Sequence, residues 1–288
     1  KTSVAVLDTA SGETLRCWTP ASGADMIIAM LPLPAGRLLL AFLFDGVQVW
    51  DWRSAELVES VPSAISPVTS LGSLIDGRVV TGGVNFFQAW DAELSRSSKL
   101  LDVRAQCADF RAFWVWSLAG LREGLVAVGV SAVRIRRDVA TEDLYRAAHA
   151  IQLWDVDAEA CVARLRGHVD SVNHIVQLHD GRLASYSGGQ VDQGSSQSRE
   201  CTVKVWRRSP LPERRFEVER TLLGHRGDVY QLAEWGPGRL ASASCDGTVR
   251  VWNTDDGACV AVLEHMTAAT MEELGGCPPR ERHLGGAL

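Results

Sequence analysis

A five-residue pattern recurs along the chain: apolar, polar, apolar, tryptophan, polar. Such alternation with a period of two is typical of a β-strand that buries one face. The five copies are Val47–Asp51, Phe87–Asp91, Ile151–Asp155, Val203–Arg207 and Val249–Asn253. A sixth copy, Val4–Asp8, has a leucine in place of the tryptophan. The pattern therefore predicts a strand of the same kind in each of six repeated units.

The stretch Gly224–Asn253 is the most complete repeat, and it predicts what surrounds that strand. Pro237-Gly238 marks a turn, because proline fixes φ and glycine permits a positive φ. Asp246-Gly247 is the strongest short signal for a β-hairpin. Together with the residues that follow it, the stretch predicts four antiparallel strands: Val229–Leu232, Arg239–Ser244, Thr248–Trp252 and Cys259–Glu264.

This stretch begins with a Gly-His pair and ends with Trp252-Asn253, and it resembles the WD40 repeat. In that family Gly-His and a strand ending in Trp-Asp mark one four-stranded blade of a β-propeller, with a period of about 40–45 residues. The resemblance implies an all-β fold, a WD40-type β-propeller of four-stranded antiparallel blades. It also implies a hydrogen-bonded structural tetrad in the blade, made of His225, Ser242, Asp246 and Trp252.

The first three units depart from the family pattern because they lack the Gly-His pair, which occurs only at Gly167-His168 and Gly224-His225. We therefore expect the edges of those three blades to rely on apolar packing. The five tryptophans of the repeated strand are expected in the core rather than as stacking platforms. Trp114 and Trp116 share one face of a predicted strand, and a packed aromatic pair is the usual outcome.

Two units are longer than the others, and their extra residues replace the turn between the second and third strands. The insertions are Ser131–Ala148 and Ser187–Glu200, and both leave the sheets on the face that carries the Gly-His connections. Long loops on a rigid scaffold are the usual binding elements. The predicted partner-binding residues are Arg134, Arg136, Arg137, Gln190 and Asp192. The alternative interpretation of the arginines is solvated loop charge, balanced by nearby acidic residues.

The two ends of the chain predict partial blades. Residues 4–8 and 14–18 supply a third and a fourth strand, whereas Thr270–Leu274 and His283–Leu288 supply a first and a second. Together with the five full units, these partial blades amount to about six blades. We expect them to form a single propeller domain over residues 1–288. Either the ends meet and close a six-bladed ring, or the chain is a segment of a larger propeller. The second interpretation is favoured because proteins rarely leave sheet edges open.

The composition of the chain is that of an ordinary globular protein, and it argues against several kinds of partner and site. The chain has 288 residues, 46% hydrophobic and 22% charged, as in ordinary globular proteins. Its net charge of −6 argues against nucleic acid as a partner. The seven cysteines form no Cys-x-x-Cys pair, which favours reduced thiols in the cytoplasm, or the nucleus, and no metal site. Prolines interrupt the apolar span Met26–Phe44, so it predicts two strands and no membrane helix.

No catalytic motif and no cofactor fingerprint is present in the sequence. The predicted first strands are mainly apolar, with His174 as the exception, which disfavours an enzyme that uses the central channel. The sequence therefore predicts a non-enzymatic scaffold or adaptor whose loops hold a protein or peptide on one face. The alternative is a propeller module of a larger protein, such as a ubiquitin-ligase adaptor or a signalling protein, whose activity lies elsewhere.

Overall fold

A computed structural model describes most of the chain, in two compact units. Unit 1 comprises Lys1–Ala140 with Gln152–Val162, and unit 2 comprises Thr141–Ile151 with Ala163–Leu288. The described residues are 3–8, 10–20, 26–43, 45–61, 65, 67–104, 110–134, 149–188, 201–209 and 216–264. The C-terminal strands predicted at Thr270–Leu274 and His283–Leu288 lie outside these ranges. The single-domain assignment stays a prediction.

The described regular structure is β-sheet, apart from two short 3-10 helices at Pro34–Gly36 and Arg122–Gly124. A two-stranded sheet contains β1 (Val4–Leu7) and β2 (Thr14–Trp18). Two blades of unit 1 follow: β3 (Ile27–Leu33), β4 (Arg37–Phe42), β5 (Gly46–Asp51) and β6 (Glu56–Val61), then β7 (Val68–Ser73), β8 (Val79–Gly83), β9 (Phe86–Trp90) and β10 (Leu101–Asp102).

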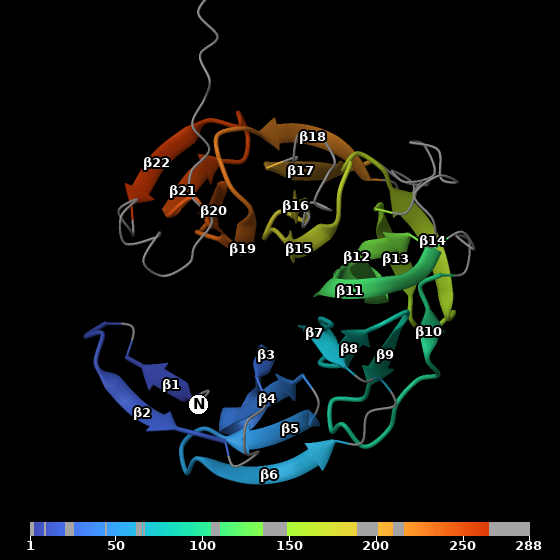
Figure 1. Cartoon of the computed structure of the whole chain (residues 1–288), viewed down its shortest axis with the longest axis vertical. Helices are drawn as coiled ribbons and strands as arrows, with labels where there is room; N and C mark the ends of the chain where they lie inside the picture. The colour runs from blue at the N-terminus through green and yellow to red at the C-terminus, as the bar shows by residue number, and fades with distance from the viewer. Residues whose placement is uncertain are drawn as a thin grey trace, which may run out of the picture. The chain divides into compact units, whose positions relative to one another are not determined.

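Three more four-stranded sheets complete the described part of the chain (Figure 1). They are β11 (Phe110–Gly120), β12 (Leu125–Arg134), β13 (Ile151–Asp155) and β14 (Ala160–Leu165); β15 (Val172–Gln177), β16 (Leu183–Ser187), β17 (Thr202–Arg208) and β18 (Phe216–Leu222); and β19 (Val229–Glu234), β20 (Arg239–Ser244), β21 (Thr248–Asn253) and β22 (Cys259–Glu264). Each sheet orders its strands as the chain does, with antiparallel neighbours. The predicted four-stranded antiparallel blades are confirmed.

The recurring tryptophan lies in the third strand of each blade. These side chains are all buried, and they are Trp50, Trp90, Trp154, Trp206 and Trp252. Leu7 occupies the matching position of β1, and its shorter side chain is exposed. The prediction that the tryptophans build the core is therefore confirmed, and large aromatic rings account for much of the burial in each blade.

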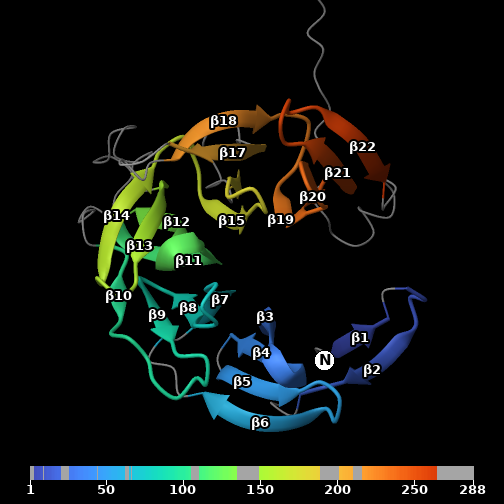
Figure 2. The same cartoon turned by 180° about the vertical axis from the view of Figure 1, so that it is seen from behind.

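In unit 2, blades β15–β18 and β19–β22 lie side by side in both views (Figures 1 and 2) and share one apolar core. We call the face that a blade turns to the next blade along the chain its forward face, and the opposite face its rear face. The forward face of β15–β18 contributes Leu178, Ala184, Tyr186, Val203, Val205 and Leu222. The rear face of β19–β22 contributes Val229, Leu232, Leu240 and Trp252.

Two sequence predictions for unit 1 can be compared with its strands. The apolar span Met26–Phe44 forms β3 and β4 around a tight turn, as predicted. No helix in the described residues is both long and apolar enough to cross a membrane. The insertion predicted at Ser131–Ala148 is wrong at its start, because β12 continues to Arg134 and pairs with β11 as far as Phe110. The strand therefore extends the hairpin to Arg134 instead of opening a loop at Ser131.

Candidate functional site

The sequence-predicted tetrad side chains lie together in blade β19–β22. His225 Nδ1 lies 2.9 Å from Asp246 Oδ2, and its Nε2 lies 2.6 Å from Ser242 Oγ. The indole Nε1 of Trp252 donates to the same hydroxyl at 2.8 Å. Thr248 also donates its hydroxyl to Asp246 at 2.6 Å. These bonds satisfy polar groups inside the blade, so the arrangement holds structure and leaves no group free to act on a ligand.

Hydrogen bonds also lower the pKa of the tetrad carboxyl. Burial raises the pKa of Asp246, but the bonds from His225 and Thr248 and from the Arg226 amide outweigh it and hold this pKa far below its usual range. Asp246 is therefore an ionised acceptor at neutral pH. Blade β15–β18 has a shorter version of the network, in which Ser185 Oγ lies 2.7 Å from both His168 Nε2 and Trp206 Nε1.

In the first three blades the indole N–H groups of the tryptophans have hydrogen-bond acceptors in addition to the apolar packing that the sequence predicts. Trp50 Nε1 donates to Gln48 at 3.0 Å, and Trp154 Nε1 donates to Gln152 at 2.9 Å. In blade β7–β10, Trp90 Nε1 donates to Thr81 on the second strand at 3.0 Å. A buried indole N–H needs an acceptor. Where the histidine and serine are missing, a nearby amide or hydroxyl provides it.

Gln152→Ala should destabilise unit 1 by about 1–3 kcal/mol, because it leaves two buried groups unpaired. Gln152 accepts from Trp154 and donates from Nε2 to the Val103 carbonyl at 3.0 Å. Hydrogen exchange of the β12 and β13 amides measures the loss. Gln231→Ala, at an exposed position, is the matched control. Equal protection in the two variants would contradict the account.

The residues predicted to bind a partner fall mostly outside the described chain. Arg134 is the last residue of β12 and pairs with Phe110. The other four, Arg136, Arg137, Gln190 and Asp192, lie outside the described residues. The structure describes the strand ends from which the two insertions leave the sheets. The candidate site is therefore built from the described residues beside those strand ends.

Every first strand has a β-bulge at the same place. In each described blade the register between first and second strands shifts around one equivalent residue, and these residues are Ile28, Thr69, Trp116, Asn173 and Tyr230. In β11 a second shift lies between Phe110 and Ala112. A bulge leaves one residue unpaired and turns its side chain in a new direction, and bulges are common beside functional sites. The bulges could not be predicted from the sequence, because the alternation with a period of two continues on both sides of each bulge residue.

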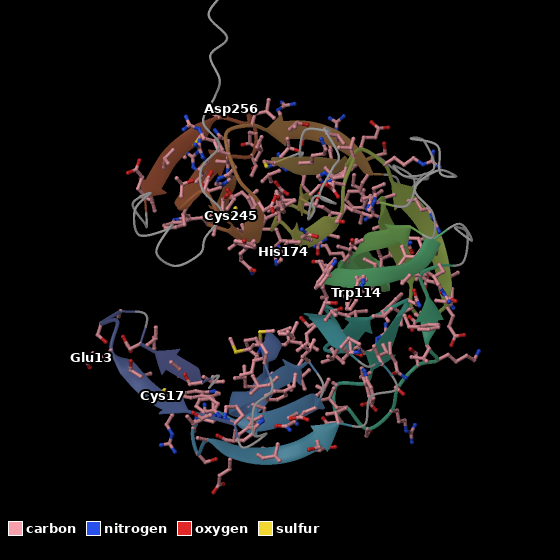
Figure 3. All side chains as sticks on the ribbon, viewed as in Figure 1. Glu13, Cys17, Trp114, His174, Cys245 and Asp256 are labelled. Carbon is pink, nitrogen blue, oxygen red and sulfur yellow. The ribbon has the colours of Figure 1, made fainter. Side chains whose placement is uncertain are left out.

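Two of the five bulge residues are exposed aromatic side chains. Trp116 is 41% exposed, and Tyr230 is 67% exposed. The Trp116 ring stacks on that of Trp114, with centroids 5.5 Å apart and planes 12° from parallel. Figure 3 labels Trp114 on β11. The prediction of a packed aromatic pair is thus confirmed for the contact between the two rings. It is wrong for the burial of Trp116, which remains at the surface.

The bulges lie at the end of each blade from which the insertions leave. In blade β11–β14, Val115 beside the bulge pairs with Val130, near the end of β12. In blade β15–β18, the bulge residue Asn173 donates from Nδ2 to the carbonyl of Gly188, which follows the end of β16 at the start of the predicted second insertion. The exposed aromatic side chains and the bases of the long loops therefore occupy the same end of their blades.

Comparison with known proteins supports the repeat assignment. A family model described as WD domain, G-beta repeat, matches residues 216–253. A crystal structure titled "Crystal structure of RRP9 WD40 repeats" matches 86% of this chain and 68% of that chain, with a TM-score of 0.61 and 17% identity. Residues 216–253 therefore form a WD40 repeat. The prediction of this family and of its β-propeller fold is confirmed.

The curated relatives that the chain matches are longer proteins. "Protein HIRA" of Oryza sativa subsp. japonica is 36% identical over 112 residues, which cover 38% of this chain and 11% of that protein. "WD repeat-containing protein 26 homolog" of Arabidopsis thaliana is 26% identical over 260 residues, 80% of this chain and 41% of that protein. The WD40 chain therefore spans less than half the length of these relatives.

The described WD40 blades hold no cluster of His, Cys, Asp or Glu side chains that could bind a metal ion. Burial lowers the pKa of His174, the polar exception on the first strands (Figure 3), which makes this imidazole neutral at physiological pH. Its Nδ1 is buried and has no hydrogen-bond partner among the described side chains. Nδ1 of His174 therefore has no hydrogen-bonded partner with which to act as an acid–base pair.

Proposed function

We propose that this WD40 propeller is a non-enzymatic scaffold that binds a protein or peptide partner at the blade ends carrying the bulge residues. Propellers of this family typically serve protein–protein interactions. Trp116 in unit 1 and Tyr230 in unit 2 would each anchor a partner, since tryptophan and tyrosine are enriched among the residues that dominate binding energy. The predicted loop residues, including Arg136 and Asp192, would contribute specificity around these anchors.

The stacked pair on β11 is the observation that carries this proposal. A tryptophan that is 41% exposed forgoes much of the hydrophobic stabilisation that its burial would give. Its partner Trp114 holds the ring in one orientation by stacking, so little side-chain freedom is lost when a ligand packs on it. A rigid, exposed indole beside a long loop is what a recognition surface needs.

Trp116→Ala should reduce partner capture by tenfold or more, on the scale of about 2 kcal/mol typical of a hot spot. The measurement is quantitative mass spectrometry of proteins retained from source lysate by immobilised wild-type and variant chains. Trp52→Ala is the matched control. Trp52 directly follows the last residue of β5, and Cζ of Arg53 lies 4.8 Å from the centroid of its ring. A partner that Trp52→Ala loses and Trp116→Ala retains would contradict the proposal.

We further propose that the protein works in the cytoplasm or nucleus. Cys17 and Cys259 are exposed and form no disulfide. Exposed unpaired thiols suit a reducing compartment. Expression of a fluorescent fusion in source cells tests this, and a secreted or luminal signal would contradict it.

A further inference from the structure

The backbone that carries the Trp114–Trp116 pair is bonded to the preceding blade, which lies beside it within unit 1 (Figures 1 and 2). The amide of Asn85 donates to the Phe113 carbonyl at 2.7 Å, and Oδ1 of Asn85 accepts from the Phe113 amide at 2.9 Å. Val84, next to Asn85, forms an isolated antiparallel bridge with Trp114. The turn between β8 and β9 therefore holds β11 directly at the residues that precede Trp116.

Asn85 suits this turn through its backbone as well as its side chain. Its φ of 68° lies in the left-handed region, which asparagine tolerates better than most residues that carry a side chain. Its carbonyl accepts from the amide of Val103, directly after β10, at 2.9 Å. Three atoms of Asn85 are thus bonded, so the turn is fixed at the place where it meets β11.

Two buried hydroxyl groups of β7 hold the bulge itself. The register between β11 and β12 shifts at Trp116, between Val115 and Ser117. The Val115 carbonyl accepts from Thr69 Oγ1 at 2.6 Å and from Ser70 Oγ at 2.9 Å. Both donors are buried, and a buried carbonyl that loses its donors is costly. The peptide group that leads into Trp116 is therefore fixed by the preceding blade.

The two blades approach so closely here that glycines form part of the contact. A Cβ atom on Gly82 would lie 2.6 Å from both Ser70 Oγ and Val115 Cγ1. A Cβ atom on Gly72 would lie 2.7 Å from the carbonyl oxygen of Leu118. These distances are shorter than van der Waals contact, so any larger residue would push the strands apart. The forward face of β7–β10 therefore meets β11 in a close-packed seam.

We propose that Asn85, Thr69 and Ser70 are positioning residues that hold the Trp114–Trp116 pair in the orientation in which it binds a partner. This inference rests on the proposed function, in which Trp116 anchors the partner. The bonds lie on both sides of Trp114 and end at the peptide group of Trp116, so they limit the shifts of register that would redirect the indole. An anchor that is ordered before binding loses less conformational entropy when the partner packs on it.

Fluorine NMR of the full chain labelled with fluorotryptophan reports the position of the Trp116 ring without any partner. Trp116→Phe assigns its resonance, which the stacked ring of Trp114 displaces from that of the free amino acid. We expect Asn85→Gly to move this resonance towards the free value and to broaden it. Glycine keeps the positive φ and loses the Oδ1 acceptor, whereas Asn85→Asp keeps both and should leave the resonance in place.

The same spectrum tests the two hydroxyl groups. Thr69→Val combined with Ser70→Ala removes both donors to the β11 carbonyl, and it should also shift and broaden the Trp116 resonance. Thr81→Val is the matched control, because it removes the acceptor of Trp90 Nε1 and so weakens the same blade. Trp90 belongs to the core that this blade shares with β3–β6, on the side away from β11. This control should leave the Trp116 resonance unchanged.

Partner capture from source lysate gives the functional readout. We expect Asn85→Gly and the Thr69→Val/Ser70→Ala double variant to lower capture about two- to tenfold, the cost of ordering one side chain on binding. This loss should be smaller than that in Trp116→Ala, which removes the anchor. Asn85→Asp and Thr81→Val should capture the partner as the wild type does.

Three results would overturn the proposal. One is an unchanged Trp116 resonance in both Asn85→Gly and the double variant. Another is an equal displacement in Thr81→Val, which would indicate general loosening of the blade. The third is a displaced resonance with full partner capture, which would show a merely structural role. If Trp116→Ala itself captures the partner as the wild type does, the proposed function fails, and the resonance shifts alone decide whether these residues hold the ring.

Discussion

Trp206→Ala is expected to lower the unfolding free energy of unit 2 by about 3–5 kcal/mol, the range for removing a buried aromatic side chain. Trp206 is fully buried at the centre of its blade. Its ring contacts His168 edge to face, with centroids 5.8 Å apart, and its Nε1 donates to Ser185. Hydrogen exchange of the β16 and β17 amides measures the local free energy of opening.

Trp206→Phe separates packing from hydrogen bonding. Phenylalanine keeps much of the ring and loses the N–H, so we expect a loss of about 1–2 kcal/mol. An alanine variant that loses no more protection than the phenylalanine variant would show that the ring is not what holds the blade together.

Asp246→Asn should cost blade β19–β22 about 2–3 kcal/mol at pH 7, because the carboxylate accepts charge-assisted bonds. The donors are His225, the Arg226 amide and Thr248. Since the folded pKa of Asp246 lies below its unfolded value, its contribution is complete above the ordinary aspartate pKa of about 3.9 and is lost as pH falls below it. The difference between wild type and variant should therefore be constant from pH 7 to about 5 and shrink below about 4.

Urea denaturation across this pH range, followed by the exchange of β20 and β21 amides, measures the effect. Glu264→Gln removes an exposed carboxylate from the same blade and should leave stability unchanged. A gap that persists unchanged below pH 3 would contradict the pKa assignment of Asp246.

The third strands could be predicted because local pattern and tertiary role coincide there. Alternation puts the tryptophan on the face opposite its two apolar neighbours, and both faces of the strand are buried against other blades or within the core, so every predicted copy is a strand. The acceptors of the indole N–H groups could not be predicted in the first three blades. Gln48 and Gln152 lie two residues before their tryptophans, but nothing local to the sequence says that their amides turn inward.

The candidate site was less predictable than the fold. A bulge arises from the pairing of two strands. The direction of the Trp116 side chain is therefore set by the register between β11 and β12, and not by the residues next to Trp116 in the sequence. The predicted loop residues remain predictions.

The central claim is that partners bind at the bulge end of the blades. Hydroxyl-radical footprinting of the chain, alone and with a captured partner, tests it directly by reporting the oxidation of each aromatic side chain. The account predicts that the partner slows oxidation of Trp116, Tyr230 or both and leaves Trp52 unchanged. Slower oxidation of Trp52, with Trp116 and Tyr230 unaffected, would contradict it.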